Sequence, residues 1–144
     1  MTAARQQPPR LAGVLETALY VDDMGRARAF YEGVLGLRAM AEDDRLTAYP
    51  VGRGSVLLLF RRGSATTTAR LPGGTIPPHD GAGPLHMAFA VDLADLPAWQ
   101  ERLERTGIAI EGWTEWPRGG VSLYFRDPDH HLLELATPGL WQNY

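Results

Sequence analysis

An internal repeat constrains this 144-residue chain more than any other feature of its sequence. The segments LETALYVD at 15–22 and LHMAFAVD at 85–92 share leucine, alanine, valine and aspartate at matched places. Alternating apolar residues in each segment are typical of a strand, and a helical stretch follows both of them. Because a duplicated unit makes positions in its two copies equivalent, we expect two similar modules within one domain.

Each repeat continues with the same series of predicted elements. The first helix is predicted over 24–36 and the second over 93–107, and a glycine ends each of them. Three strand-like runs follow each helix, at 37–41, 45–51 and 54–60 in the first half and at 108–115, 120–126 and 131–136 in the second. The predicted fold is α+β, with two tandem βαβββ modules that form a cup-shaped mixed sheet and carry their helices on its outer face.

The expected segments of the chain follow from this order. The stretch between the halves is rich in glycine, proline and threonine and shows no strand or helix periodicity, so it is interpreted as a long surface connection. The expected boundaries are a loose leader at 1–12, a first module at 13–61, the connection at 62–84, a second module at 85–137 and a C-terminal tail at 138–144. The aromatic tail is expected to dock on its own domain, at a subunit interface or over the mouth of the cup.

Strand alternation divides the side chains between the helix-covered face and the concave face of each module. The more apolar sets are expected to pack under the helices: Leu15, Leu19 and Val21 in the first module, and Leu85, Met87, Phe89, Val91, Leu133 and Leu135 in the second. Glu16, Ala18 and Tyr20 then face the concave side, as do His86, Ala88 and Ala90, and Leu132, Glu134 and Ala136. Glu134 is a carboxylate within an apolar run, so a metal ion or an arginine is expected to compensate its charge.

The composition narrows the chemistry of the chain. It contains no cysteine and no lysine, and all 14 of its basic residues are arginines, which excludes thiolate and Schiff-base chemistry. A net charge of −3 gives no reason to expect binding to nucleic acid or to an anionic membrane, so the expected partner is a small molecule. The first residues lack the apolar core of a secretory signal, and no segment approaches the length of a membrane span, which predicts a cytoplasmic protein.

Two phrases of the sequence resemble a known superfamily. LYVDDMGRARAFYEGVLGL opens the first module, and SLYFRDPDHHLLEL closes the second. With the duplicated βαβββ order, they resemble the vicinal oxygen chelate superfamily over about residues 13–137. That superfamily includes glyoxalase I, extradiol dioxygenases, epimerases, fosfomycin-resistance transferases and bleomycin-binding proteins.

The resemblance implies a metal site at four equivalent positions of the two modules. Glu16, His86 and Glu134 occupy three of them, whereas the fourth is Leu58, so the expected site has three ligands and open coordination positions. Two carboxylates and one imidazole suit one divalent ion of Mn, Fe, Ni or Zn. In this superfamily the modules meet within one chain or across a dimer, and we expect a homodimer.

The sequence leaves three functions open, of which the first two use the expected metal site and the third predicts no metal. The leading hypothesis is a metal-dependent lyase or isomerase of the glyoxalase type, acting on vicinal oxygens with Glu134 or Glu16 as the base. The second hypothesis is a ring-cleaving dioxygenase, which the spacing between Tyr124 and Glu134 supports. A non-catalytic drug- or metabolite-binding protein is the third, while a fosfomycin transferase is disfavoured because that family uses a lysine.

Further residues are candidates for contact with the substrate. Tyr20, Leu58 and Phe60 would form apolar walls, together with Val56 and Tyr124 in the binding-protein alternative. His79 in the connection would act as a lid residue or an acid and base, Arg118 in WPRGG would bind an anionic group, and Arg126 shares the face of Tyr124. His130 and His131 are interpreted as turn residues rather than ligands, and His130 is expected at positive φ.

Overall fold

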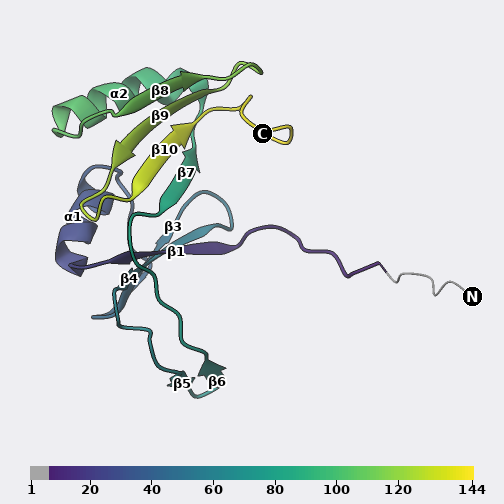
Figure 1. Cartoon of the computed structure of the whole chain (residues 1–144), viewed down its shortest axis with the longest axis vertical. Helices are drawn as coiled ribbons and strands as arrows, with labels where there is room; N and C mark the ends of the chain where they lie inside the picture. Colours follow the sequence, from purple (N-terminus) through teal and green to yellow (C-terminus); the bar gives the residue numbers. More distant parts are fainter. Residues whose placement is uncertain (1–6) are drawn as a thin grey trace, which may run out of the picture.

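Each half of the chain forms a mixed four-stranded sheet with one main helix. The computed structural model describes residues 7–144, and Figure 1 shows the two halves as neighbouring units. The first module contains β1 (Glu16–Val21), α1 (Met24–Gly33), β2 (Ala41–Glu42), β3 (Leu46–Pro50) and β4 (Val56–Arg61). Its strand order is β1-β4-β3-β2, in which β1 is parallel to β4 and the other pairs are antiparallel.

The second module repeats this arrangement. Its strand order is β7-β10-β9-β8, again with one parallel pair between the outermost first strand and its neighbour. The predicted fold class of two βαβββ modules is therefore confirmed. The elements of this module are β7 (His86–Ala90), a short 3₁₀ helix η1 (Leu93–Asp95), α2 (Leu96–Arg105), β8 (Gly112–Glu115), β9 (Val121–Arg126) and β10 (Leu132–Ala136).

Strand register makes the equivalence of the two modules explicit. In the first module Ala18 of β1 lies opposite Leu58 of β4, and in the second Ala88 of β7 lies opposite Glu134 of β10. Leu58 and Glu134 are thus structural counterparts, as the repeat predicted.

Both helices differ in extent from their predictions. Helix α1 begins at an N-cap, where the Asp23 carboxylate accepts a hydrogen bond from the backbone nitrogen of Arg26 at 2.8 Å, and it ends three residues before Gly36. The second predicted helix is divided, because η1 precedes α2 and Pro97 lies in the first turn of α2. A proline in the first turn removes no intrahelical hydrogen bond, so it is compatible with the start of a helix there.

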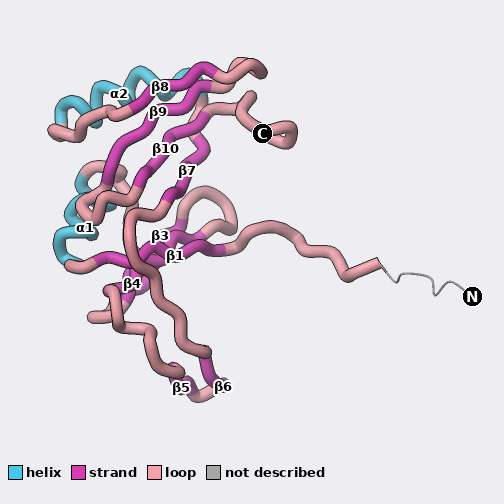
Figure 2. The backbone as a smooth tube through the Cα atoms, in the orientation of Figure 1, coloured by secondary structure: helices cyan, strands magenta, loops and turns pink. Residues whose placement is uncertain are grey.

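The connection between the modules contains a hairpin that the sequence analysis did not predict. Strands β5 (Ala69–Leu71) and β6 (Gly74–Ile76) pair around Pro72 and Gly73, and Figure 2 shows them far from both main sheets. Their side chains are half-buried or exposed. Without a buried face the strands carry no apolar alternation, and for this reason periodicity missed them.

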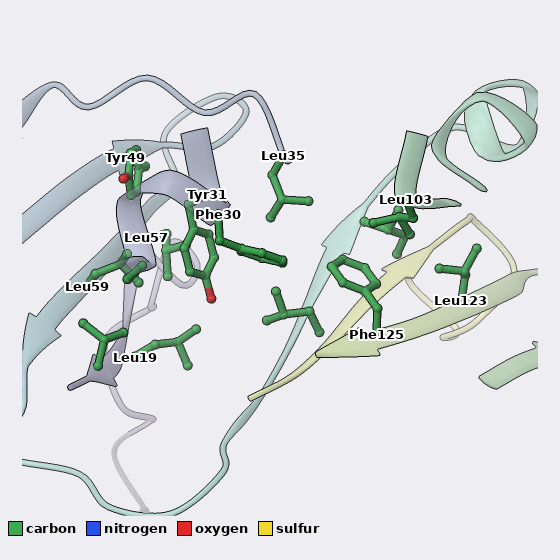
Figure 3. Close-up of a cluster of buried hydrophobic side chains, with 14 of the residues drawn as sticks. Leu19, Phe30, Tyr31, Leu35, Tyr49, Leu57, Leu59, Leu103, Leu123 and Phe125 are labelled. Carbon is green, nitrogen blue, oxygen red and sulfur yellow. The ribbon is translucent and has the colours of Figure 1, made fainter. Parts of the chain in front are cut away.

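One apolar core joins the two modules. Phe30 of α1 lies 6.3 Å from Phe125 of β9, measured between ring centroids, and Figure 3 shows Phe30 extending toward Phe125. The Tyr31 hydroxyl donates a 2.7 Å hydrogen bond to Asp127 of the second module. Burial raises the pKa of Tyr31, with the Asp127 charge as the next cause, so this hydroxyl stays protonated. The modules therefore share apolar and polar contacts.

His131 corrects the interpretation of the two adjacent histidines. It was expected in the turn, but it follows the turn residues, and its fully buried side chain links the modules. Nδ1 accepts a hydrogen bond from the backbone nitrogen of Leu85 at 2.8 Å, so Nε2 carries the hydrogen donated to the Tyr20 carbonyl at 2.7 Å. His130 has the predicted positive φ, at 64°.

Near the ends of the described chain, the predicted burial of Leu15 is wrong, and the C-terminal tail shows one of its expected contacts. Leu15 was expected under the helices but is 65% exposed, because it precedes β1 and the buried cluster begins on this strand at Leu19. Part of the predicted leader, residues 1–6, lies outside the described residues. In the C-terminal tail, the Tyr144 hydroxyl donates to the Ala136 carbonyl at 2.7 Å, whereas Trp141 is exposed. Across residues 7–144, no helix has the length and apolar character needed to cross a membrane.

Candidate functional site

A pocket of about 470 Å³ lies on the concave face of the first module. Five of the predicted site residues line it, namely Glu16, Tyr20, Leu58, Phe60 and His79. The first four come from β1 and β4, because alternate residues of these paired strands point to one side of the sheet. His79 reaches the same pocket from the connection. A volume of this size is within the range of small-molecule sites.

Tyr20 and His79 form a polar contact at the wall of this pocket. The Tyr20 hydroxyl lies 2.7 Å from His79 Nδ1. Burial, with the Asp80 charge as a smaller cause, raises the pKa of Tyr20, so the hydroxyl keeps its proton near neutral pH. The tautomer of His79 sets which of the two groups donates. The His79 ring also packs edge-on against Phe60, with ring centroids 4.6 Å apart.

The backbone around His79 is fixed by close packing. The His79 nitrogen donates to the Ala65 carbonyl at 2.9 Å. Gly81 lies directly against the Tyr20 ring, where an added Cβ would be 2.2 Å from a ring carbon. A side chain at Gly81 would therefore displace Tyr20, and with it the contact to His79.

The concave face of the second module carries a different arrangement, built around the Glu134 carboxylate. Glu134 is only 5% exposed, and its Oε2 accepts a hydrogen bond from Ser122 Oγ at 2.5 Å. Ser122 in turn accepts one from Trp116 Nε1 at 2.8 Å. Glu134 Oε1 lies 3.3 Å from Nε2 of His86. The carboxylate is thus held by a hydroxyl and an imidazole, and no arginine within residues 7–144 pairs with it, although an arginine was one of the two expected partners.

The hydrogen bonds of His86 show what this pair requires. His86 Nδ1 lies 2.8 Å from the Leu132 carbonyl, which can only accept, so Nδ1 carries a hydrogen. In a neutral ring, Nε2 would then direct a lone pair at the Glu134 carboxylate. Two acceptors at this distance need a proton or a cation between them, and metal-binding histidines are commonly oriented by a carbonyl on their second nitrogen. The donor atoms of His86 and Glu134 therefore fit a metal ion.

Glu16, the third predicted ligand, does not join this pair in one cluster. It is exposed at the start of β1 and lines the pocket of the first module, whereas His86 and Glu134 do not line that pocket. Within residues 7–144, no three side chains of histidine, cysteine, aspartate or glutamate gather closely enough to hold a metal. One chain therefore brings two of the predicted ligands together and leaves out the third.

The remaining predicted residues have varied surroundings. The Tyr124 ring lies 6.5 Å from that of His86, and a Cβ on the facing Gly112 would approach it to 3.1 Å. Arg118 is exposed in the turn between β8 and β9 and does not line the first-module pocket. Arg126 is paired with Glu111 at 3.0 Å, so its charge is already compensated.

Sequence reasoning assigned no role to Ser122, Trp116 or Arg45. Ser122 is two residues before Tyr124 and so lies on the same face of β9, but its hydrogen bond to Glu134 depends on the register between β9 and β10. Trp116 reaches Ser122 from the turn after β8, and no local pattern indicates such a contact. Arg45 follows Asp43 in a turn and lines the first-module pocket.

Comparisons with known proteins give the family. The sequence matches the Glyoxalase/Bleomycin resistance protein/Dioxygenase superfamily over residues 13–135, and the chain belongs to this superfamily. Its structure is similar to that of a lactoylglutathione lyase from Agrobacterium tumefaciens, with a TM-score of 0.83, 35% identity, and coverage of 94% of this chain and 99% of that one.

Two curated relatives are metallothiol transferases named FosB. The relative from Staphylococcus saprophyticus is 30% identical over 118 residues, which cover 81% of this chain and 71% of the relative. The relative from Bacillus licheniformis is 26% identical over 129 residues, which cover 89% and 77%. The superfamily resemblance noted from the sequence is thus confirmed.

Proposed function

We propose that the protein is a divalent-metal-dependent lyase or isomerase of the glyoxalase type, acting on a small molecule with vicinal oxygens. The observation that carries the proposal is the pair of His86 Nε2 and Glu134 Oε1, 3.3 Å apart, with the second nitrogen of His86 already bonded to a carbonyl. The two facing acceptors are satisfied by a proton or by a cation, and a metal ion is the choice that the similarity to a lactoylglutathione lyase supports.

In this proposal His86, Glu134 and Glu16 hold one ion of Mn, Fe, Ni or Zn. When bound, the ion would supply Lewis-acid polarisation of the two substrate oxygens. The Leu132 carbonyl orients His86, and Ser122 orients Glu134. The Glu16 side chain has no hydrogen bond or ion pair with the other described residues. Either Glu16 or Glu134 would leave the ion to take a proton from one substrate carbon and return it to the neighbouring one.

Glu16 reaches the metal, we infer, from a second copy of the chain. The first strands β1 and β7 are both at the edges of their sheets, and His86, Ala88 and Trp113 of the second module are exposed around the cup. In a two-fold dimer, the first-module cup of one copy would face the second-module cup of its partner, which completes two identical sites. Such a dimer also accounts for the separation of Glu16 from His86 in one chain.

The metal part of the proposal is tested by elemental analysis of protein purified without chelator. We expect about one divalent ion per chain and a fall of at least tenfold in Glu134→Gln, since a ligand oxygen becomes an amide nitrogen or a weaker donor. Glu115→Gln, an exposed position in the same module, is the matched control and should retain the metal. Absence of metal from both wild type and variants would favour a non-catalytic binding protein that uses the apolar pocket.

The shared site is tested by mixing two inactive chains. Glu16→Gln and Glu134→Gln are each expected to lose the metal site, but a mixed dimer would combine the intact Glu16 of one chain with the intact Glu134 of the other. Random pairing of equal amounts restores about a quarter of the sites, because half of the dimers are mixed and each has one intact site. No recovery of metal or activity on mixing would show that the site does not span two copies.

The reaction class is tested with metal-loaded protein. Turnover of a hemithioacetal, or proton exchange into an α-hydroxy-thioester, is expected for the lyase or isomerase. The relatives named metallothiol transferases favour thiol transfer as a second candidate, against the absence of lysine from this chain. Consumption of an added thiol is the assay that separates it. Oxygen uptake with a catechol under Fe²⁺ would instead indicate the dioxygenase.

A further inference from the structure

Arg45 lines the first-module pocket, and its guanidinium has no ion-pair partner among the described residues. The residue is half-buried, and its Nε atom is buried without a hydrogen-bond partner. Across residues 7–144 its guanidinium takes part in no hydrogen bond or ion pair, in contrast to Arg62 and Arg126, which are paired with carboxylates. A buried guanidinium N–H without an acceptor is costly, so an acceptor from outside the chain would stabilise it.

The turn that carries Arg45 is held firmly from both sides. Asp43 Oδ1 accepts hydrogen bonds from the backbone nitrogens of Arg45 at 2.7 Å and Leu46 at 2.9 Å. These two bonds, more than the Arg45 charge, lower the pKa of Asp43. The Arg45 carbonyl accepts from the Arg61 nitrogen at 2.8 Å. The carboxylate of Asp43 is thus engaged with the backbone, and the guanidinium is held at the pocket without it.

Strand register places Arg45 and Glu16 at opposite ends of the pocket. Leu46, next to Arg45, lies opposite Phe60, which in turn lies opposite Tyr20. Glu16 is four residues before Tyr20 on the same strand, or about 13 Å at the rise of an extended chain. Between the two charged ends, Leu58 and Phe60 give the pocket wall an apolar stretch, and the Tyr20–His79 pair lies beside Phe60. The pocket therefore has a cationic end, an apolar middle and an anionic end.

We propose that Arg45 determines substrate specificity by binding the carboxylate or similar anion at one end of an elongated, largely apolar substrate. The planar guanidinium suits such an anion, and the Glu16 carboxylate repels it from the other end, so the substrate enters in one orientation. The proposal rests on the proposed function only in assigning the reacting oxygens to the Glu16 end. Binding of the anion itself depends on Arg45 and the pocket.

A pair of probes of nearly equal shape tests this role. 2-Naphthoate carries a carboxylate, while 2-naphthamide replaces it with a neutral amide, and equilibrium dialysis gives the affinity of each for the full-length protein. We expect wild type to bind naphthoate about tenfold more tightly than naphthamide, and Arg45→Gln to reduce this preference to within about twofold. Arg53→Gln removes an exposed arginine from the loop between β3 and β4, and it should leave the preference unchanged.

Further variants keep the outcome interpretable. Arg45→Lys keeps the charge and should retain part of the preference, which also provides a folded comparison if the glutamine variant is unstable. Glu134→Gln separates the two proposals, because a carboxylate bound through the metal would lose its advantage there, whereas one bound by Arg45 would keep it. The inference is overturned if wild type does not prefer naphthoate, or if the preference survives in Arg45→Gln.

Discussion

The two modules share one backbone plan but present opposite chemistry on their concave faces. In the first module Leu58 and Leu46 occupy the positions that Glu134 and Ser122 occupy in the second. Conversely, the aromatic residues Tyr20 and Phe60 of the first module correspond to Ala90 and Ala136 of the second, by the same register. One module thus forms a largely apolar pocket with a charged residue at each end, and the other buries a carboxylate.

This difference shows how a duplicated fold can divide its tasks. Replacing leucine by glutamate at a concave position creates a buried charge, and the serine at the neighbouring position supplies the hydrogen bond that such a charge needs. Replacing alanine by tyrosine or phenylalanine fills the cup with apolar surface. If the two cups face one another across a dimer, pocket and ligand pair become parts of one site. Each contrast between equivalent positions can be reversed by mutation.

The largest effect is expected when the buried carboxylate of the second module is replaced by the residue at the equivalent position of the first. Glu134→Leu copies Leu58, so the divalent metal content should fall at least tenfold. The free energy of unfolding should change by less than about 2 kcal/mol. Leucine replaces a buried charge, and no permanently charged partner is left without its counter-charge. Elemental analysis and urea denaturation measure the two quantities. Retention of metal in this variant would contradict the assignment of Glu134 as a ligand.

A second effect concerns the hydrogen bond that orients Glu134. Ser122→Ala removes the hydroxyl 2.5 Å from Glu134 Oε2 and should weaken metal affinity about tenfold or more, as removal of groups that orient metal ligands generally does. Competition with a chelating dye measures this affinity. Ser55→Ala, in the exposed loop before β4, is the matched control. Equal affinities in both variants would show that Ser122 has only a structural role.

The sequence predicted the repeated architecture well because each strand carries one apolar face. Alternation correctly separated Leu19 and Val21 from Tyr20, and the repeat paired Leu58 with Glu134. The exposed hairpin β5–β6 was missed because it lacks a buried face. His131 was misinterpreted because its environment depends on two partners, Leu85 and Tyr20, from distant parts of the chain.

The candidate site could be predicted only in part for a related reason. Position on a strand shows which face a side chain takes, and this brought Glu16, Tyr20, Leu58 and Phe60 to one pocket. It does not show whether two modules of one chain turn their cups toward each other. The distance of Glu16 from the pair of His86 and Glu134 depends on that packing, which the contacts of α1 with the second module determine.

A third effect is expected when the first module is made like the second at its aromatic wall. Phe60→Ala copies Ala136 and removes the ring that packs against His79 and Tyr20. The affinity for 2-naphthoate should fall about fivefold to tenfold, since aromatic contact area is lost from the pocket. Leu93→Ala, an exposed apolar residue of η1, should leave the affinity unchanged. Unchanged binding in Phe60→Ala would place the probe outside this pocket.

The smallest expected effect is on stability at alkaline pH, to which a buried tyrosine of the first module contributes and the equivalent phenylalanine of the second does not. Tyr49 of β3 corresponds by register to Phe125 of β9, and both side chains are fully buried. Burial, followed by the charge of Glu32, raises the pKa of Tyr49 to about 12. In the unfolded chain tyrosine ionises near pH 10, so the native state binds more protons between these values. The contribution of Tyr49 to stability is therefore complete below about pH 10 and is lost as the pH rises toward 12.

Tyr49→Phe copies the second module and should flatten this alkaline loss of stability. At neutral pH the variant should lose about 1 kcal/mol, because the hydrogen bond from the Tyr49 hydroxyl to Glu32 at 3.2 Å is removed. Urea denaturation at pH 7, 9 and 10.5 measures both effects. Tyr124→Phe, at a half-buried position of the second module, controls for the loss of any tyrosine. An equally steep alkaline slope in Tyr49→Phe and wild type would show that other groups cause it, with Tyr31 at the contact between the modules as the next tyrosine to replace.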